Sequence, residues 1–102
     1  MVIKNILKEL ETSEKPVGKM LRKGEGFHVL AIGFKKDMLL PKHTSSLPAR
    51  LLVIKGEVVY NNAEGANRLG LYDEYEIPVD EPHWVEASEE SIILVIKGHL
   101  TE

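Results

Sequence analysis

The feature that most constrains the fold is a succession of short apolar runs between Val17 and Lys97. Residues typical of turns, such as Lys35–Asp37 and Asn61–Gly65, separate the runs. The runs are Lys19–Leu21, Phe27–Phe34, Met38–His43, Ala49–Lys55, Glu57–Tyr60, Tyr75–Pro78, Trp84–Ala87 and Ser91–Lys97. Many short strands at this spacing predict an all-β sandwich or barrel.

The beginning of the chain has a different pattern. Apolar residues recur there at helical spacing, with charged residues between them, at Val2, Ile3, Ile6, Leu7 and Leu10. This pattern predicts a short amphipathic helix, and the start of a strand is the alternative. The polar segment 11–16 follows as a loop. We therefore expect an N-terminal helix or arm at 1–16 and a single barrel domain at 17–102.

Two of the runs are apolar on both faces. Leu51–Ile54 and Ile92–Ile96 contain no alternating polar residues. A strand with one face in water would alternate apolar and polar side chains. We therefore expect the outer face of these strands to be covered, either by the N-terminal helix or by a second subunit.

The composition excludes several classes of protein. The chain has 102 residues, 43% of them hydrophobic, which suits one domain with a modest core. The lack of cysteine excludes disulfides, thiol catalysis and cysteine-ligated zinc. The net charge of −3 is spread along the chain without a basic, aromatic-rich patch, so we expect no nucleic-acid partner. We also expect a cytoplasmic location, with no signal peptide and no membrane span.

Two segments of the chain each carry one histidine just inside a predicted strand. His43 lies in PKHTSSLPARLLVIKGEV and His83 lies in LYDEYEIPVDEPHWVEA. Together the segments resemble the two signature motifs of the cupins, small β-barrels that often hold a metal between their strands. The resemblance spans Val29 to Lys97 and implies an all-β cupin barrel, or jelly roll, preceded by the short helix or arm.

The first cupin motif runs G-x5-H-x-H, then three or four residues, E, six residues and G. We anchor it on His43 and the final Gly56. The opening glycine then falls on Asp37 and the second histidine on Ser45. The acid falls on Ala49, or on Arg50 with the longer spacing. Two of the residues that usually bind metal are therefore replaced.

The second motif runs G-x5-P-x-G-x2-H-x3-N, and Pro78 and His83 match it at the right spacing. Tyr72 stands at the first glycine, Asp80 at the inner glycine and Ala87 at the asparagine. A glycine in such a motif indicates a left-handed backbone, which aspartate tolerates better than most residues. We therefore expect Asp80 to have a positive φ.

The resemblance implies that His43 and His83 are metal ligands and that both, with Ser45, contact a small-molecule ligand. Neutral imidazole is the commonest metal ligand in proteins, and Zn, Fe, Mn and Ni are the candidate divalent ions. Because side chains alternate along a strand, we expect both histidines inside the barrel, close together. A third ligand would have to come from another segment, and the candidates are Glu57, Glu74 and Glu76. The alternative is two interior histidines that are hydrogen-bonded to backbone, water or each other, with Ser45 as a small polar filler.

The neighbours of these residues are expected on the outer face. If His83 points inward, Trp84 points outward, where a partner or a helix would cover it. By the same alternation Arg50 points outward, and inward binding of an anion is the alternative. His28 and His99 lie outside the motifs, and we expect them to be solvated or locally hydrogen-bonded. The apolar outer faces and Trp84 together predict a homodimer.

Three functions are compatible with these residues. The first is a small cupin barrel that binds an unidentified small molecule at a degenerate two-histidine site. The second is a metal-dependent cupin enzyme of the oxygenase or isomerase type that uses His43 and His83. The third is a structural or interaction protein without a ligand. The chain has no G-x-S-x-G serine and no Gly-rich phosphate loop.

Overall fold

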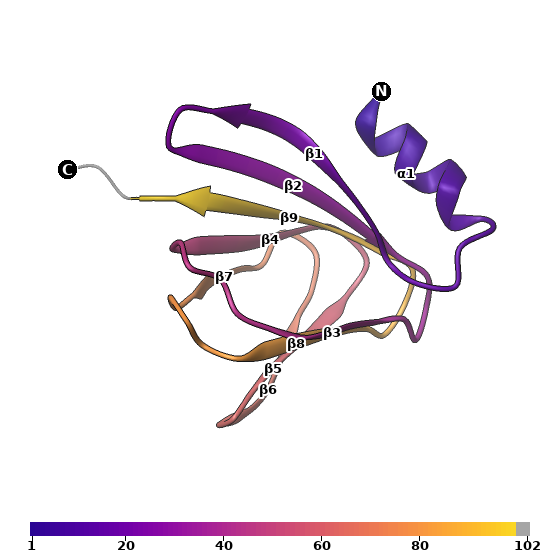
Figure 1. Ribbon diagram of the computed structural model, residues 1–102. Coiled ribbons are helices and arrows are strands. Elements are labelled where there is room, and N and C mark those ends of the chain that lie inside the picture. The colour runs from indigo at the N-terminus through magenta and orange to yellow at the C-terminus, as the bar shows by residue number, and fades with distance from the viewer. Residues whose placement is uncertain (100–102) are drawn as a thin grey trace.

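The computed structural model describes residues 1–99, which form one short helix followed by nine strands (Figure 1). In chain order these elements are α1 (Val2–Leu10), β1 (Val17–Gly24), β2 (Phe27–Phe34), β3 (Leu39–His43), β4 (Ala49–Lys55), β5 (Val58–Asn62), β6 (Gly65–Leu69), β7 (Glu74–Ile77), β8 (His83–Ala87) and β9 (Ser91–Gly98). The predicted all-β architecture is confirmed, and so is the predicted N-terminal helix. Within residues 1–99, no helix combines the length and the apolar character that crossing a bilayer requires.

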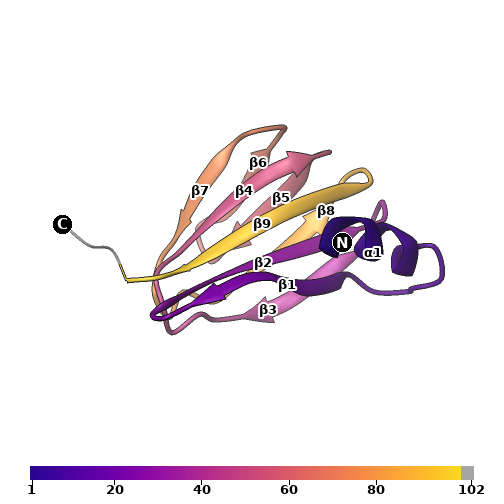
Figure 2. The same cartoon turned by 90° about the horizontal axis from the view of Figure 1, so that it is seen from above.

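The strands form two antiparallel sheets that pack face to face as a jelly-roll barrel. The larger sheet has the order β1-β2-β9-β4-β7 and the smaller one the order β3-β8-β5-β6. Figure 2 shows β1, β2, β9 and β4 side by side in the larger sheet. Neighbouring strands are mostly distant in sequence, as β9 between β2 and β4 illustrates, so the barrel depends on long-range pairing.

The core lies between the two sheets. Alternate residues of the central strands point inward, and Phe34, Val53, Tyr60 and Ile93 are fully buried there. Inward-facing side chains of both sheets interdigitate in this way in β-sandwiches and jelly rolls. The packing of these side chains fixes which residues of each strand face the interior.

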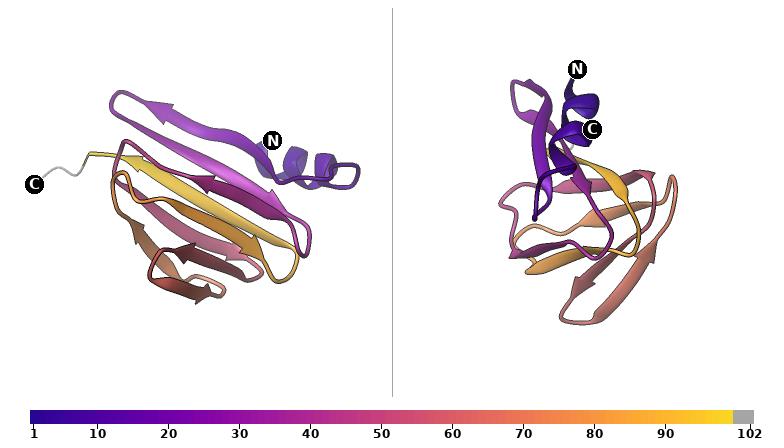
Figure 3. Two further views of the ribbon diagram at one scale, coloured as in Figure 1. Left: turned by 60° about the horizontal axis from the view of Figure 1, so that its bottom comes forward. Right: turned by 90° about the vertical axis from the view of Figure 1, so that its right-hand side faces the viewer.

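Helix α1 covers part of the outer face of the larger sheet. Its apolar residues Ile6 and Leu10 are buried against Ala31 and Leu94. A Cβ atom on Gly33 would lie only 2.4 Å from Cγ2 of Ile6, so the glycine allows the helix to approach β2 closely. Figure 3 shows the helix beside β1 and β2. The cover that we predicted for this apolar face is therefore supplied by α1 at one end of the sheet.

Strand β6 was not predicted from the sequence, and the Asn61–Gly65 turn was placed too broadly. Asn61 and Asn62 belong to β5, and Asn62 pairs with Gly65 across a tight hairpin. The β6 sequence GANRL contains little apolar periodicity. The strand forms because the hairpin places it beside β5, where backbone pairing compensates for its weak intrinsic preference.

Within residues 1–99, three residues other than glycine have a left-handed backbone, and they are the three that replace motif glycines. Their φ angles are 71° at Asp37, 67° at Tyr72 and 59° at Asp80. The prediction for Asp80 is confirmed. The turns are held by backbone hydrogen bonds, for example from the Asp37 N–H to the Ala87 carbonyl at 2.8 Å. The barrel thus keeps the turn geometry of the motifs after losing the residues that adopt it most easily.

Candidate functional site

A cavity of about 300 Å³ opens between the two sheets, at the end of the barrel where β9 finishes. We call this the open end. The wall is mainly apolar and includes a few polar residues. Its lining residues are Leu30, Ile32, Leu40, Pro41, Lys42, His43, Ser45, Ala49, Leu51, Ile77, His83, Val85, Ile93, Val95 and Lys97. No carboxylate belongs to this described wall.

His43 and His83 lie opposite each other on the neighbouring strands β3 and β8. Their ring centroids are 4.3 Å apart and the ring planes are inclined by 59°. His83 is 2% exposed, whereas His43 is exposed at the mouth of the cavity. The expected proximity is confirmed, but only His83 is an interior residue.

A bulge in β3 places His43 on the cavity side. Leu40 pairs with Val85 and His43 pairs with His83, so three steps along β3 match two along β8. Without the extra residue, strict alternation from Leu40 would turn His43 away from the cavity. The bulge and the position of β3 at the edge of its sheet together leave His43 open to solvent.

Both histidines have the same tautomer, because each Nδ1 lies 2.8 Å from a backbone carbonyl. The His43 Nδ1 donates to the Pro41 oxygen and the His83 Nδ1 donates to the Glu81 oxygen. A carbonyl can only accept, so the proton is on Nδ1 and each Nε2 carries a lone pair. Neither Nε2 has a hydrogen-bond partner among the described residues. The two lone pairs are available to a metal ion or to a ligand that donates a hydrogen bond.

The environment of His83 keeps the ring neutral. Burial lowers the pKa of His83, and the neighbouring His43 and Lys97 lower it further, against the effect of the Glu81 carbonyl. The buried Tyr60 ring stacks on His83 at a centroid distance of 5.1 Å, and its hydroxyl donates to Glu81 Oε1 at 2.9 Å. Burial and this contact with Glu81 raise the pKa of Tyr60, so its hydroxyl stays protonated.

Ser45 lies in the cavity wall, but its hydroxyl is already used. Oγ donates to the Leu47 carbonyl at 2.8 Å, and the residue is 6% exposed. The Ser45 carbonyl accepts a hydrogen bond from the Asp80 N–H at 2.8 Å. Ser45 therefore joins the loop after His43 to the turn before His83 and helps to position both histidines.

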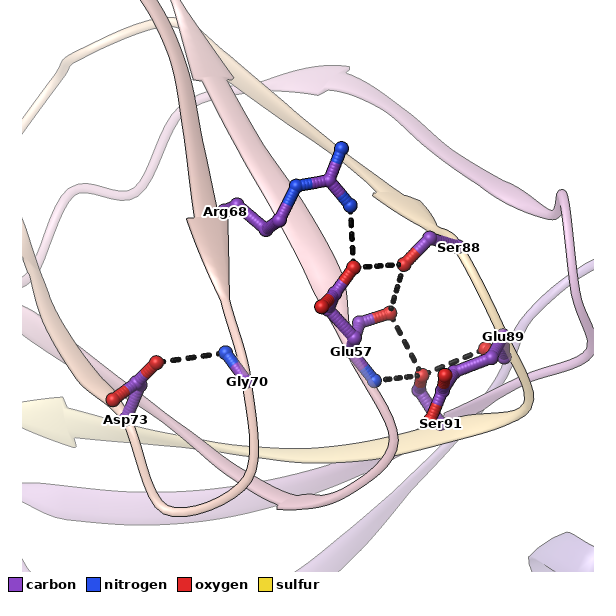
Figure 4. Close-up of polar contacts among 7 residues, drawn as sticks. All are labelled: Glu57, Arg68, Gly70, Asp73, Ser88, Glu89 and Ser91. Atoms are coloured by element: carbon purple, nitrogen blue, oxygen red, sulfur yellow. Dashed lines mark hydrogen bonds and ion pairs between the residues drawn. The ribbon is translucent and has the colours of Figure 1, made fainter.

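None of the three candidate carboxylates reaches the histidines, and that hypothesis is wrong. Glu57 pairs with Arg68 at the other end of the barrel (Figure 4). Glu74 and Glu76 pair with Arg50 on the outer face of the larger sheet. The hydrogen bonds and charges of these two glutamates raise the pKa of Arg50. Arg50 therefore points outward, as the alternation of β4 predicts.

The donors at the open end do not form a complete metal site. Ser45 replaces the second histidine of the motif, and its hydroxyl is hydrogen-bonded to the Leu47 carbonyl. Ala49 replaces the acid, and this residue is buried and has no group that could bind a metal. Within residues 1–99, no group of three or more histidine, aspartate or glutamate side chains could hold an ion. Zinc sites use three or four protein ligands, and non-haem iron sites use two histidines and a carboxylate. The two imidazoles fit at most a weakly held ion.

Lys97 is a cavity residue that was not predicted from the sequence. Its charged side chain is directed inward. It follows Ile93 and Val95 at alternate positions of β9, and all three line the cavity. The same period of two that placed Arg50 outward could have placed Lys97 inward. The continuous apolar run Ile92–Ile96 that precedes Lys97 shows no alternation, so the inward position of Lys97 was not evident from the sequence.

The remaining expected residues lie outside the cavity. Trp84 is half-buried on the outer face of β8, and the Lys42 ammonium lies 5.1 Å from its ring centroid, which covers part of the ring. His28 is half-buried beside Lys97, and His99 is exposed. Only His43, Ser45 and His83 of the predicted residues meet at the cavity.

Several solved structures with a similar arrangement of strands are described as cupins. No protein-family model matches the sequence, and no curated protein does. A cupin superfamily protein from Desulfitobacterium hafniense superposes with a TM-score of 0.78 at 14% identity, over 84% of this chain and 79% of that one. An RmlC-like cupin protein from Desulfovibrio desulfuricans gives 0.77 at 20% identity, over 83% of each chain. A cupin-like protein from Thermotoga maritima gives 0.75 at 24% identity, over 81% of this chain and 68% of that one.

These similarities define the fold. The chain has the fold of a small single-domain cupin, with two antiparallel sheets and one short helix. At identities of this size the likeness concerns the fold, and a cupin fold hosts many unrelated activities. The function has to be argued from the residues at the open end.

Proposed function

We propose that this chain binds a small organic molecule in the cavity at the open end, against His43 and His83. The observation that supports this proposal is the pair of oriented Nε2 atoms, without partners among the described residues, in a mainly apolar cavity of about 300 Å³. Binding sites for small molecules have this character, with apolar walls and a few fixed polar groups.

A binding role is favoured over catalysis by the residues that stand at the other motif positions. The Ser45 hydroxyl is engaged with the Leu47 carbonyl, and Ala49 offers only a methyl group. Two neutral imidazoles can accept hydrogen bonds and orient a ligand. They lack the carboxylate that would complete an iron site.

The proposal is tested by filling the cavity. We expect members of a small-molecule panel to raise the melting temperature of the wild-type protein. Replacing Ala49 by isoleucine places a larger side chain in the cavity and should abolish these shifts. Ala66→Ile makes the same chemical change at an exposed position of β6 and should preserve them. If no compound stabilises the wild type, or if Ala49→Ile still responds, the proposal is wrong.

A metal-dependent enzyme is the second candidate, because both Nε2 atoms are oriented as metal ligands are. Protein purified without a chelator or an affinity tag should then contain about one equivalent of Zn, Fe, Mn or Ni. Because only two imidazoles are available as ligands, we expect the metal content of the purified protein to be well below one equivalent. Weak binding of added zinc should disappear in His43→Ala and in His83→Ala, should persist in His99→Ala, and should weaken as the pH falls, since protonated imidazole cannot bind a metal.

We also propose that the chain forms a homodimer through the outer face of the larger sheet, beyond α1. Phe27 and Ile96 expose 44% and 39% of their surface there, although they lie on regular strands. A second copy with the same patch would cover them in a symmetric dimer. Sedimentation velocity at tens of micromolar should give a dimer, and Ile96→Lys should give a monomer. Val79→Lys, at an exposed loop position, is the matched control.

A further inference from the structure

Two lysines, Lys42 and Lys97, belong to the cavity wall, and the Lys42 ammonium lies 5.1 Å from the centroid of the Trp84 ring on the outer face of β8. Lys97 is the last inward-facing residue of β9, after Ile93 and Val95, and it is half-buried. Its neighbours across the sheet are His28 on β2 and Ala49 on β4. The side chain therefore leaves the sheet beside the apolar wall and on the same side as the cavity.

The charge of Lys97 has no counterion among the described residues. The cationic side chains of Lys19, Arg50, Lys55 and Arg68 each pair with a glutamate on the outside of the barrel. Lys97 forms no such pair with a described residue, and the cavity wall contains no aspartate or glutamate. An anion bound in the cavity beside this half-buried side chain would supply the missing counterion.

Other basic residues continue from Lys97 along the sheet. Lys23 on β1 pairs with His28 on β2, and His28 pairs with Lys97 on β9. Residues directly opposite each other on neighbouring strands share a face, and the strands are about 4.8 Å apart. The three side chains therefore lie in a row on the cavity side of the larger sheet, and of the three only Lys97 lines the cavity.

We propose that the ligand is a small monocarboxylate with an apolar body, and that Lys97 holds its carboxylate. This inference rests on the proposed function and names its ligand class. The apolar part packs between the sheets against residues such as Leu30, Ile32 and Val95. The Nε2 atoms of His43 and His83 accept a hydrogen bond from a hydroxyl or amino group of the ligand.

A carboxylate fits this site better than a phosphate does. Phosphate sites usually combine several backbone N–H groups of a helix N-terminus or a glycine-rich loop with arginine. The open end provides one inward lysine and strand residues, while Arg50 is engaged on the outer face. One lysine in an apolar cavity matches one negative charge.

The test compares acids with amides of nearly the same shape. Benzoate and benzamide form one pair, and hexanoate and hexanamide form another. In wild-type protein each acid should bind about tenfold more tightly than its amide, as measured by NMR titration. Lys97→Met should remove this difference and leave amide affinity within about twofold, because the apolar wall is unchanged. Lys97→Arg should retain it. Lys36→Met, at an exposed turn, is the control and should behave as wild type.

The results separate this inference from the proposed function. If acids and amides bind equally well and Ala49→Ile abolishes both, the cavity binds ligands but the assignment of an anion is wrong. If the acid preference persists in Lys97→Met, the assignment of Lys97 is wrong. If neither acids nor amides bind, and no other compound of the panel stabilises the protein, the proposed function fails and the inference fails with it.

Discussion

The two ends of the barrel differ in whether their polar groups have hydrogen-bond partners within the protein. We call the end at Gly56 and Ser91 the closed end. There the Glu57 N–H donates to the buried Ser91 Oγ at 3.0 Å, and the Glu57 carbonyl accepts from the Ser88 N–H at 3.1 Å. The Glu57 carboxylate accepts from the Ser88 hydroxyl at 2.7 Å and pairs with Arg68 (Figure 4).

At the open end, the two histidine Nε2 atoms and the Lys97 ammonium have no described partner and line a cavity. Strands β4, β8 and β9 run from one end to the other, so the same elements carry both arrangements. Buried polar groups are normally satisfied, and those at the closed end stabilise the fold. Polar groups left available beside a cavity indicate a binding site instead. Variants at the closed end should therefore affect stability, and variants at the open end should affect binding.

The largest effect is expected at Gly56. Its φ is 77°, and an added Cβ would lie 2.2 Å from the Glu90 carbonyl oxygen. Gly56→Ala should lower the free energy of unfolding by about 3 kcal/mol or more, because it combines backbone strain with a clash. Gly26→Ala is a matched control, since Gly26 also has a φ of 77° but no atom near the added Cβ. It should cost only about 1 kcal/mol. Equal losses in urea denaturation would show that the closed end is not tightly packed.

The next effect is expected at Ser91, which is fully buried at the closed end. Ser91→Ala leaves the Glu57 N–H without its hydrogen-bond acceptor and should cost about 1–3 kcal/mol. The affinity for a cavity ligand should stay unchanged, because the cavity lies at the other end. A loss of affinity without a loss of stability would contradict the division between the two ends.

A smaller effect is expected at Asp80, in the turn that leads to His83. Asp80→Gly should be neutral or slightly stabilising, since glycine adopts a φ of 59° freely. The β-branched Asp80→Val should destabilise the protein by roughly 1–2 kcal/mol. Urea denaturation of both variants measures the difference, and equal stability would show that the turn carries no strain of this kind.

The smallest effect concerns pH. The pKa of His83 is lowered in the folded protein, chiefly by burial, from an ordinary value of 6.5. The unfolded chain therefore binds more protons, so stability is fully present above about pH 6.5 and decreases as the pH falls through the folded-state pKa. The loss should not exceed about 1.4 kcal/mol per pH unit, the limit for one proton. His83→Gln should remove this contribution, and His99→Gln, at an exposed position, should not.

The closed end should respond in a different pH range. The hydrogen bond from Ser88 and the pairing with Arg68 lower the pKa of Glu57 from 4.5. Its contribution is present above about pH 4.5 and is lost as the pH falls below that value. Arg68→Met should therefore reduce the change in stability with pH below about pH 4.5, whereas His83→Gln should reduce the change that begins at about pH 6.5. Coinciding ranges would mean that the two ends do not titrate independently.

The class of the fold and much of the site could be predicted from the amino-acid sequence. Short apolar runs predicted the strands, because alternation and turn residues are local properties of the chain. The resemblance to the cupin motifs, which rests on His43, Gly56, Pro78 and His83, implied which strands would bring two histidines together. It also identified Asp80 as a residue with a left-handed backbone, although no glycine remains there.

The completion of the site depends on contacts between distant strands, which the sequence does not reveal. The bulge between Leu40 and His43 depends on pairing with β8, and β6 exists because β5 lies beside it. The partners of Glu57, Glu74 and Glu76 come from other strands, which removed these carboxylates from the site. Lys97 became a cavity residue when the two sheets enclosed a space beside it. Contacts between distant segments depend on register and packing, which are properties of the whole barrel, whereas the period of a single strand is fixed by its own residues.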